Sequence, residues 1–158
     1  MTDNSILTKT QPHAKPLSYV AGPYSADPSL VPGLQHEIKE TRFRVLTLAS
    51  CMLAQCKGWN PFSPITHSHA MHVIGGLRGD WAYWEKIDRE YLSISERIVI
   101  VTLDGWEKSV GVNAETEIAR QFGIPIWHLT EPELNNGCYT AWLTDNHTGE
   151  FLKYAITT

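Results

Sequence analysis

The side chains best suited to chemistry are acidic residues that follow an apolar run in the second half of the chain. The run 97–103 predicts a buried strand, and a polar loop with Asp104 and Ser109 leads from it into a helix that carries Glu115. Such loops, at the carboxyl ends of parallel strands, are where open α/β sheets bind ligands. We expect the helix dipole to keep a carboxylate in the first helical turn ionised, as a nucleophile at a sugar carbon requires. The alternative is that Glu115 and Glu117 only complement the helix dipole.

Three further segments place polar side chains beside predicted strands and helices. An apolar strand runs into Gly22-Pro-Tyr-Ser25, and Asn60-Pro-Phe-Ser-Pro-Ile-Thr-His67 and Asp88-Arg-Glu-Tyr-Leu92 follow it in the chain. In this order, and together with the Glu115 loop, the segments resemble the nucleoside 2-deoxyribosyltransferase superfamily. That superfamily includes transferases, nucleotide N-glycosidases, and phage and bacterial branches of unassigned function. The resemblance covers residues 17–130, which is most of the chain.

The resemblance implies a role for each candidate residue. Glu115 matches the nucleophile of the superfamily, and Asp88 matches an acid that acts near the leaving base. Tyr24 matches an aromatic or polar side chain that orients the nucleophile and the sugar. Asp104 matches a sugar-contacting acid, and Ser109 matches a position that contacts the 5′-phosphate in the nucleotide-hydrolysing branch. The expected substrate contacts are Gly22, Ser25, Asp104, Ser109, Gly111 and Asn113.

The expected reaction is cleavage of an N-glycosidic bond. Its oxocarbenium-like state needs negative charge beneath the anomeric carbon and a proton for the departing base, and two carboxyl groups in different environments supply both. Glu115 would form a covalent glycosyl intermediate, and Asp88 would serve the base as general acid. Water or a second base would then resolve the intermediate. The alternative for Asp88 is a carboxylate at a helix start or on the surface.

The residues leave the substrate and the activity open at several points. The first loop lacks the arginine of nucleotide-preferring members, and Arg42 or Arg44 either replaces it or faces solvent. Hydrolase and transferase activity, on a nucleoside or a nucleotide, are both compatible with the motifs, and deoxyribonucleoside 5′-monophosphates are the first substrate class. The alternatives are a non-catalytic nucleotide-binding or sensing module, and hydrolysis of an NAD-like or modified nucleotide. The resemblance also implies a homo-oligomer, in which Asn135, Asn136 or Asn146 would complete a neighbour's pocket.

Composition favours a compact, soluble, single-domain enzyme. The chain has 158 residues, of which 42% are hydrophobic, and its formal net charge of −4 comes from interspersed acidic and basic residues. That pattern argues against a nucleic-acid-binding face, although one phosphate needs only a few N–H groups at a helix start. The three cysteines show no metal spacing and indicate a reducing, cytoplasmic setting, in the host cytoplasm for a phage protein.

We expect neither a membrane span nor a secretory signal. No segment approaches the ~20 apolar residues of a membrane-spanning helix. Residues 1–16 lack the apolar core of a secretory signal. We therefore expect a flexible segment over residues 1–15 and one domain over residues 16–158.

The alternation of strand and helix patterns predicts a three-layer flavodoxin- or Rossmann-like α/β domain with a mainly parallel sheet. The expected elements, apart from a short strand before Asn60, are strands at 17–21, 97–103 and 126–129, helices at 36–57, 80–94 and 113–122, and a C-terminal β-hairpin from 139–143 and 151–156. The first helix is expected to bury an apolar stripe of Ile38, Val45, Leu48, Met52 and Leu53.

Three histidines, His67, His69 and His72, lie close together in a predicted loop or short helix. Three histidines can bind zinc, but these have no acidic partner at a recognised spacing. A rim that contacts substrate or stabilises the 63–72 loop is therefore the preferred interpretation. We expect no metal and no cofactor.

Aromatic residues and glycines cluster near the proposed site. The aromatic residues would either stack on a base or pack in the core or a subunit interface. They are Trp81, Tyr83, Trp84 and Trp106. The segment Gly75-Gly-Leu-Arg-Gly79 follows no predicted strand and precedes no Gly-Lys pair, so it is not a P-loop. A mobile lid over the pocket is the preferred hypothesis for it.

Overall fold

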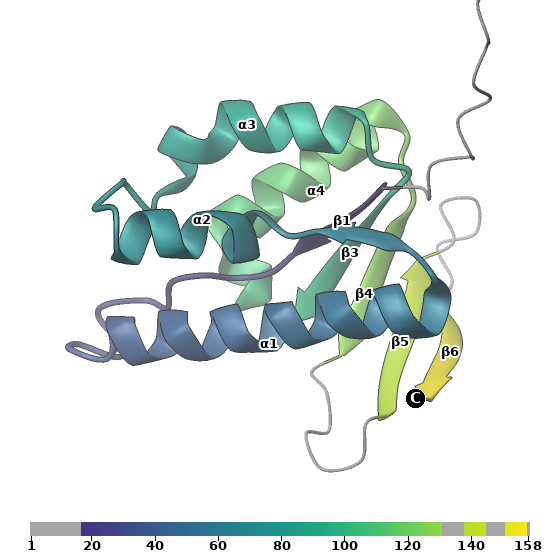
Figure 1. Ribbon diagram of the computed structural model, residues 1–158, viewed down its shortest axis with the longest axis horizontal. Helices are drawn as coiled ribbons and strands as arrows, with labels where there is room; N and C mark the ends of the chain where they lie inside the picture. The colour runs from purple at the N-terminus through teal and green to yellow at the C-terminus, as the bar shows by residue number, and fades with distance from the viewer. Residues whose placement is uncertain (1–16, 131–137, 145–150, 158) are drawn as a thin grey trace, which may run out of the picture.

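A six-stranded sheet with the order β2-β1-β3-β4-β5-β6 forms the centre of the computed structural model, which describes residues 17–130, 138–144 and 151–157 (Figure 1). Four neighbouring strands are parallel, and two antiparallel strands extend the sheet beyond β4. The strands are β1 (Leu17–Ala21), β2 (Asn60–Phe62), β3 (Arg97–Thr102), β4 (Ile126–Thr130), β5 (Cys138–Thr144) and β6 (Phe151–Thr157). The mainly parallel sheet and the C-terminal antiparallel pair are confirmed.

Helices cover both faces of the sheet, so the expected three-layer, Rossmann-like architecture is confirmed. Figure 1 shows α1 on one face and α3 and α4 on the other, while α2 packs against α1 and β1. The helices are α1 (Gln35–Lys57), α2 (Pro64–Val73), α3 (Trp81–Ser93) and α4 (Val110–Phe122), with a short 3₁₀ turn, η1 (Trp106–Lys108), before α4. No helix in the described part of the chain is long and apolar enough to cross a membrane. The expected flexibility of residues 1–15 and the roles of Asn135, Asn136 and Asn146 fall outside the described residues.

Side chains of the central strands alternate between two cores. Val20 of β1 and Val99 and Val101 of β3 pack into the core beneath α1. Tyr19 of β1 and Ile100 of β3 lie in the core beneath α3 and α4. Both faces of a parallel sheet are buried, which explains why the strands are nearly continuous apolar runs. Ser18 and Tyr19 of β1 are polar exceptions, and both are fully buried.

The apolar stripe of α1 differs from the expected one. Val45, Met52 and Leu53 are buried as expected, but Leu46 is buried too, and Leu48 is 47% exposed. The buried face is centred between positions 45 and 46, so position 48 falls about 100° away at ~100° per residue. Leu46 also faces Gly22 closely, because a Cβ at Gly22 would lie 2.7 Å from Leu46 Cδ2. A glycine at this position lets α1 pack tightly beneath the first loop.

The segment around Pro61 differs from the expected one. The short strand expected before Asn60 is β2, which begins at Asn60, and Pro64 follows at the first position of α2. β2 is the edge strand of the sheet, where a proline without an N–H is tolerated. Pro64 fits the first turn of a helix, where its N–H has no helical partner to lose.

The strand order creates a crevice at one end of the sheet. The chain moves from β1 outward to β2 and then returns to place β3 on the other side of β1. The loops that follow β1 and β3 therefore diverge to opposite faces, and a ligand can enter between them. This topology places the loops after β1, β2 and β3 at one end of the sheet, beside the start of α4.

We expect Leu46→Ala to lower the free energy of unfolding by about 2–5 kcal/mol, because it removes a fully buried side chain and leaves a cavity. Leu48→Ala is the matched control on the same helix, and its half-exposed side chain should cost much less. Chemical denaturation of both variants measures the difference. Equal losses in the two variants would contradict the assigned face of α1.

Candidate functional site

A cavity of about 1090 Å³ opens at this end of the sheet. It is lined by the loop after β1, the first turn of α2, the first turns of α3, and the loop between β3 and α4. The expected site residues that line it are Gly22, Tyr24, Ser25, Asp88, Asp104, Ser109, Gly111 and Glu115. Asn113 is not among the lining residues, because its side chain is exposed and its Nδ2 donates to the Glu107 carbonyl at 3.0 Å.

The two acids of the site lie on the inward faces of neighbouring helices. Asp88 of α3 lies between the buried residues Trp84 and Leu92, one turn away on each side. Glu115 of α4 lies on the buried face that also carries Val112. Each carboxyl group is therefore carried in an apolar stripe rather than on a solvated face. Because α3 packs against α4, the two stripes meet above β1.

Tyr19 joins the two acids, and the sequence analysis missed it. Its hydroxyl group donates a hydrogen bond to Glu115 Oε1 at 2.7 Å and also contacts the Asp88 carboxyl group. A buried tyrosine hydroxyl almost always has a partner, so a lone tyrosine in the aliphatic run of β1 was a usable signal. Its identity as the partner of Glu115 follows only from the three-dimensional arrangement.

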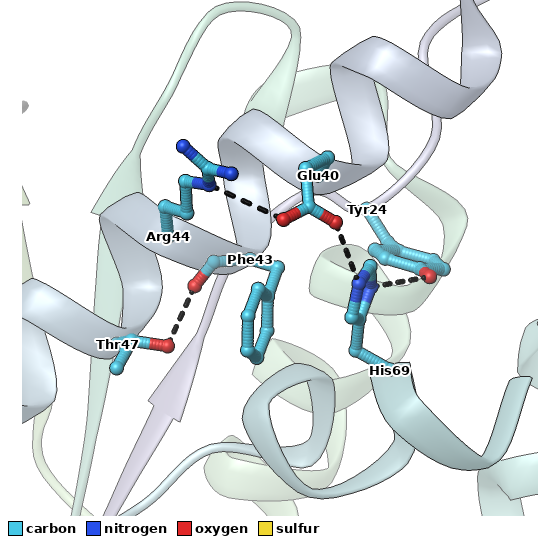
Figure 2. Close-up of polar contacts among 6 residues, drawn as sticks. All are labelled: Tyr24, Glu40, Phe43, Arg44, Thr47 and His69. Atoms are coloured by element: carbon cyan, nitrogen blue, oxygen red, sulfur yellow. Dashed lines mark hydrogen bonds and ion pairs between the residues drawn. The ribbon is translucent and has the colours of Figure 1, made fainter. Parts of the chain in front are cut away.

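Tyr24 does not orient the nucleophile as expected, and its role toward the sugar stays a prediction. The Tyr24 hydroxyl group lies 2.9 Å from His69 Nδ1 (Figure 2). The hydroxyl group that contacts Glu115 is that of Tyr19. The reason is that Tyr24 lies beyond the end of β1, on the side of α1 and α2, whereas Tyr19 points from within the strand toward α4. Tyr24 nevertheless lines the cavity.

Burial controls the protonation of both acids. Desolvation raises the pKa of Glu115 to about 8, while the Tyr19 hydrogen bond acts to lower it and the nearby Asp88 to raise it. Desolvation likewise raises the pKa of Asp88 to about 7, against the lowering effect of the Tyr19 hydrogen bond. The expectation that the helix dipole keeps Glu115 ionised is therefore wrong. The helix begins at Val110, so Glu115 lies in its second turn, and Glu115 is only 4% exposed.

One of the two arginines of α1 reaches the cavity. Arg42 Nη2 donates to the Asp104 carbonyl oxygen at 2.8 Å, and Arg42 Nη1 is buried without a hydrogen-bond partner. Arg44 is exposed and pairs with Glu40 at 3.2 Å. Lys108 adds a second cationic side chain to the wall, beside Ser109, which caps α4 by accepting from Val112 N at 3.4 Å.

The three histidines of α2 have separate partners. His67 packs against the rings of Phe62, Tyr91 and Trp84. His69 is buried between Tyr24 and Glu40, and His72 Nδ1 lies 2.6 Å from the Leu77 carbonyl oxygen. Within the described ranges, no group of three or more His, Cys, Asp or Glu side chains could hold a metal ion.

Two of the four aromatic residues noted in the sequence reach the cavity. Trp81 and Trp84 line it, whereas Tyr83 is 41% exposed and Trp106 packs against the His128 ring at 5.3 Å. The glycine-rich segment 75–79 borders the cavity through Gly79. Hydrogen bonds tie it to α2 and α3, among them the contact of His72 with Leu77 and the donation of Trp84 Nε1 to the Arg78 carbonyl at 2.7 Å. Its motion as a lid stays a prediction.

We expect the protein to lose stability as the pH rises from about 4.5, the ordinary pKa of a glutamate, to about 8, the raised pKa of Glu115. In this window the folded chain holds protons that the unfolded chain has released, so the free energy of unfolding falls with pH. Glu115→Gln should reduce the drop in Tm across this window by on the order of 5 °C. Glu117→Gln, at an exposed position of the same helix, should leave the drop unchanged. A parallel drop in Glu115→Gln and wild type, measured by calorimetry, would contradict the raised pKa.

The comparisons with known proteins identify a family for this chain. No curated protein matches the chain. A family model described as "Domain of unknown function (DUF1937)" matches residues 17–131, a range that contains the four parallel strands, all four helices and every residue that lines the cavity. Since this match covers most of the sequence, the chain belongs to the DUF1937 family.

Proposed function

We propose that this chain cleaves the N-glycosidic bond of nucleosides or, preferentially, deoxynucleoside 5′-monophosphates, the chemistry of the nucleoside 2-deoxyribosyltransferase superfamily that its motifs resemble. One observation carries the proposal. Two buried carboxyl groups, Asp88 and Glu115, share the Tyr19 hydroxyl group and line a cavity at the switch point of a parallel sheet. The burial of a carboxyl group without a cationic partner lowers the stability of the fold. Carboxyl groups buried in this way are typical of catalytic sites.

In the proposed reaction, Glu115 attacks the anomeric carbon. The bond between that carbon and the base nitrogen breaks, its electron pair goes to the base, and Asp88 supplies a proton to the departing base. The product is an ester between the sugar and Glu115. A water molecule then attacks the anomeric carbon, gives its proton to Asp88, and frees both the sugar and Glu115. A second base in place of water would make the enzyme a transferase.

The raised pKa values fit this scheme near neutral pH. With pKa values of about 7 for Asp88 and about 8 for Glu115, the empty site keeps most of its protons below neutral pH. The two pKa values lie close together, and the reaction needs Glu115 ionised and Asp88 protonated. Positive charge that develops on the sugar next to Glu115 favours the ionised form of Glu115. The Tyr19 hydrogen bond, at 2.7 Å, favours the same form.

The preference for a 5′-monophosphate rests on two cationic side chains, Arg42 and Lys108, in a cavity whose lining also carries acidic side chains. Arg42 presents a buried Nη1 with no partner, and a phosphate oxygen would satisfy that donor. Lys108 and the first N–H groups of α4, at Val110 and Gly111, line the same cavity. Helix N-termini bind phosphate through such free N–H groups and the helix dipole.

A non-catalytic nucleotide-binding module is the second candidate. It is favoured by the protonated state of Glu115 in the empty cavity, since a neutral acid is a poor nucleophile. Hydrolysis of an NAD-like or modified nucleotide is a narrower variant of the main proposal and uses the same residues. The superfamily resemblance is also the basis for proposing a homo-oligomer, and the cysteine pattern is the basis for proposing a cytoplasmic setting.

We expect the wild-type protein to release free base from at least one member of a panel of nucleosides and 5′-monophosphates, as measured by chromatography. Glu115→Gln should reduce release at least about a thousandfold, because it removes the nucleophile, and Asp88→Asn by about 10²–10⁴-fold. Glu117→Gln is the matched control and should release base at the wild-type rate. Lanes with a second free base distinguish a transferase from a hydrolase. Tight binding of a panel member without any release would favour the binding module.

We expect Arg42→Met to weaken binding of a 5′-monophosphate by about tenfold to a hundredfold, the usual cost of a hydrogen bond to a charged group. The affinity for the corresponding nucleoside, which has no phosphate, should not change. Arg89→Met, at an exposed position of α3, is the control. Calorimetric titration measures both ligands. Equal losses for nucleotide and nucleoside would show that Arg42 only supports the fold of the site.

A further inference from the structure

A second buried network, separate from the two acids, reaches the same cavity. His69 of α2 joins Tyr24 in the loop after β1 to Glu40 of α1 (Figure 2). The Tyr24 hydroxyl oxygen lies 2.9 Å from His69 Nδ1, and His69 Nε2 lies 3.1 Å from Glu40 Oε2. Three segments of the chain therefore fix the hydroxyl group of Tyr24, a residue that lines the cavity.

The partners determine where the hydrogens lie. A carboxylate can only accept, and the hydrogen bond from Arg44 lowers the pKa of Glu40, so Glu40 is ionised at neutral pH. His69 Nε2 must then carry the hydrogen that it donates to Glu40. In the neutral ring the other nitrogen, Nδ1, has a lone pair and accepts. The Tyr24 hydroxyl group consequently donates its one hydrogen to His69.

The surroundings hold this arrangement in place. His69 is 6% exposed, and its ring stacks on that of Phe43 with centroids 4.2 Å apart and planes at 10°. Lys39 Nζ lies 5.1 Å from the centre of the Tyr24 ring. Burial raises the pKa of Tyr24 to about 12, so Tyr24 keeps its hydrogen at neutral pH. The ring of His69 cannot turn without breaking the stack and both hydrogen bonds.

We propose that Tyr24 is a specificity-determining residue that offers the ligand only a hydrogen-bond acceptor, because His69 and Glu40 hold its hydrogen away from the cavity. Tyr24 thus selects a ligand that carries a hydroxyl or amino donor at this point. The choice of probes rests on the proposed function, in which those donors are a sugar hydroxyl group or the amino group of a base. A ligand without the donor would leave the lone pairs of the Tyr24 oxygen without a hydrogen-bond donor when the ligand covers them.

The direction of the hydrogen bonds is tested without any ligand. Nitrogen-15 NMR of the full chain at about pH 8, above the ordinary histidine pKa, reports which ring nitrogen of His69 carries hydrogen. We expect an unprotonated Nδ1 and a protonated Nε2. A protonated Nδ1 would overturn the proposal, because Tyr24 would then be free to donate into the cavity.

The selectivity is tested by binding in the full chain carrying Glu115→Gln, which keeps substrates intact. The probes are paired 5′-monophosphates. One arm removes the amino group (deoxyadenosine against deoxynebularine, which has purine as its base), and the other removes the sugar 3′-hydroxyl group (2′-deoxy against 2′,3′-dideoxy). We expect one arm to lose affinity by about tenfold or more, and that arm identifies the donor. Equal affinity in both arms, or no binding by any probe, would overturn the proposal.

Two substitutions at His69 separate this role from a structural one. Tyr24→Phe should remove the discrimination between the paired probes. His69→Phe should also weaken it, because the Tyr24 hydroxyl group becomes free to donate or accept. His69→Asn, whose carbonyl oxygen can take the place of Nδ1, should restore it. Discrimination that survives in both Tyr24→Phe and His69→Phe would refute the assignment. Base release is measured separately, so selective binding without cleavage would refute the proposed reaction and leave the role of Tyr24 intact.

Discussion

The burial of two carboxyl groups against one phenol is the constraint on which the site depends. Asp88 and Glu115 come from the inward faces of α3 and α4, and Tyr19 comes from the strand beneath them. A single hydroxyl hydrogen cannot satisfy two carboxylates, so the cluster is stable only while it holds extra protons. Desolvation raises both pKa values into the neutral range, against the lowering effect of the Tyr19 hydrogen bond. The need for extra protons makes the cluster a stability cost that the packing of α3 and α4 against the sheet must offset.

The topology determines why this cluster lies next to a cavity. Because β1 lies between β2 and β3, the segment after β1 diverges from the segment after β3 and leaves an opening at their carboxyl ends. Glu115 lies one and a half helical turns into α4, deep enough for burial and close enough to the helix start to line that opening. A one-residue shift along the helix would turn its side chain by about 100°, away from Tyr19.

Much of the fold was predictable because it depends on local sequence patterns. Apolar periodicity indicates the strands and helices, and glycine or proline residues mark their ends. The strands and the three long helices lie within a few residues of their expected positions. Leu48 was wrongly expected to be buried. Apolar periodicity predicts that a helix has a buried face, but the centre of that face depends on what the helix packs against. Ser109 also moved the start of α4 earlier than expected, since a capping serine can precede a helix whose first turn has no apolar pattern.

Of the candidate site, only the loops that form it and its acidic residues could be predicted from the sequence. Strand ends and acidic residues at helical positions are visible in a sequence, so Asp88 and Glu115 were found. Tyr19 and His69 were not assigned their partners, because Tyr19 meets Glu115 across 96 positions and His69 meets Tyr24 across 45. The expected ionised state of Glu115 failed for a related reason. The local helix dipole favours charge, but desolvation by α3 and the sheet, which is a tertiary effect, dominates.

The two tyrosines keep their phenolic hydrogens within the protein. Tyr19 donates to Glu115, and in the proposed arrangement Tyr24 donates to His69. The cationic donors on the wall come from Arg42 and Lys108. A ligand that matches this pattern has an anionic group at the α4 end of the cavity and hydrogen-bond donors elsewhere. A nucleoside 5′-monophosphate has both, and its glycosidic bond lies between its phosphate and the amino group of its base. The two cationic side chains therefore support the ligand orientation that the proposed reaction needs.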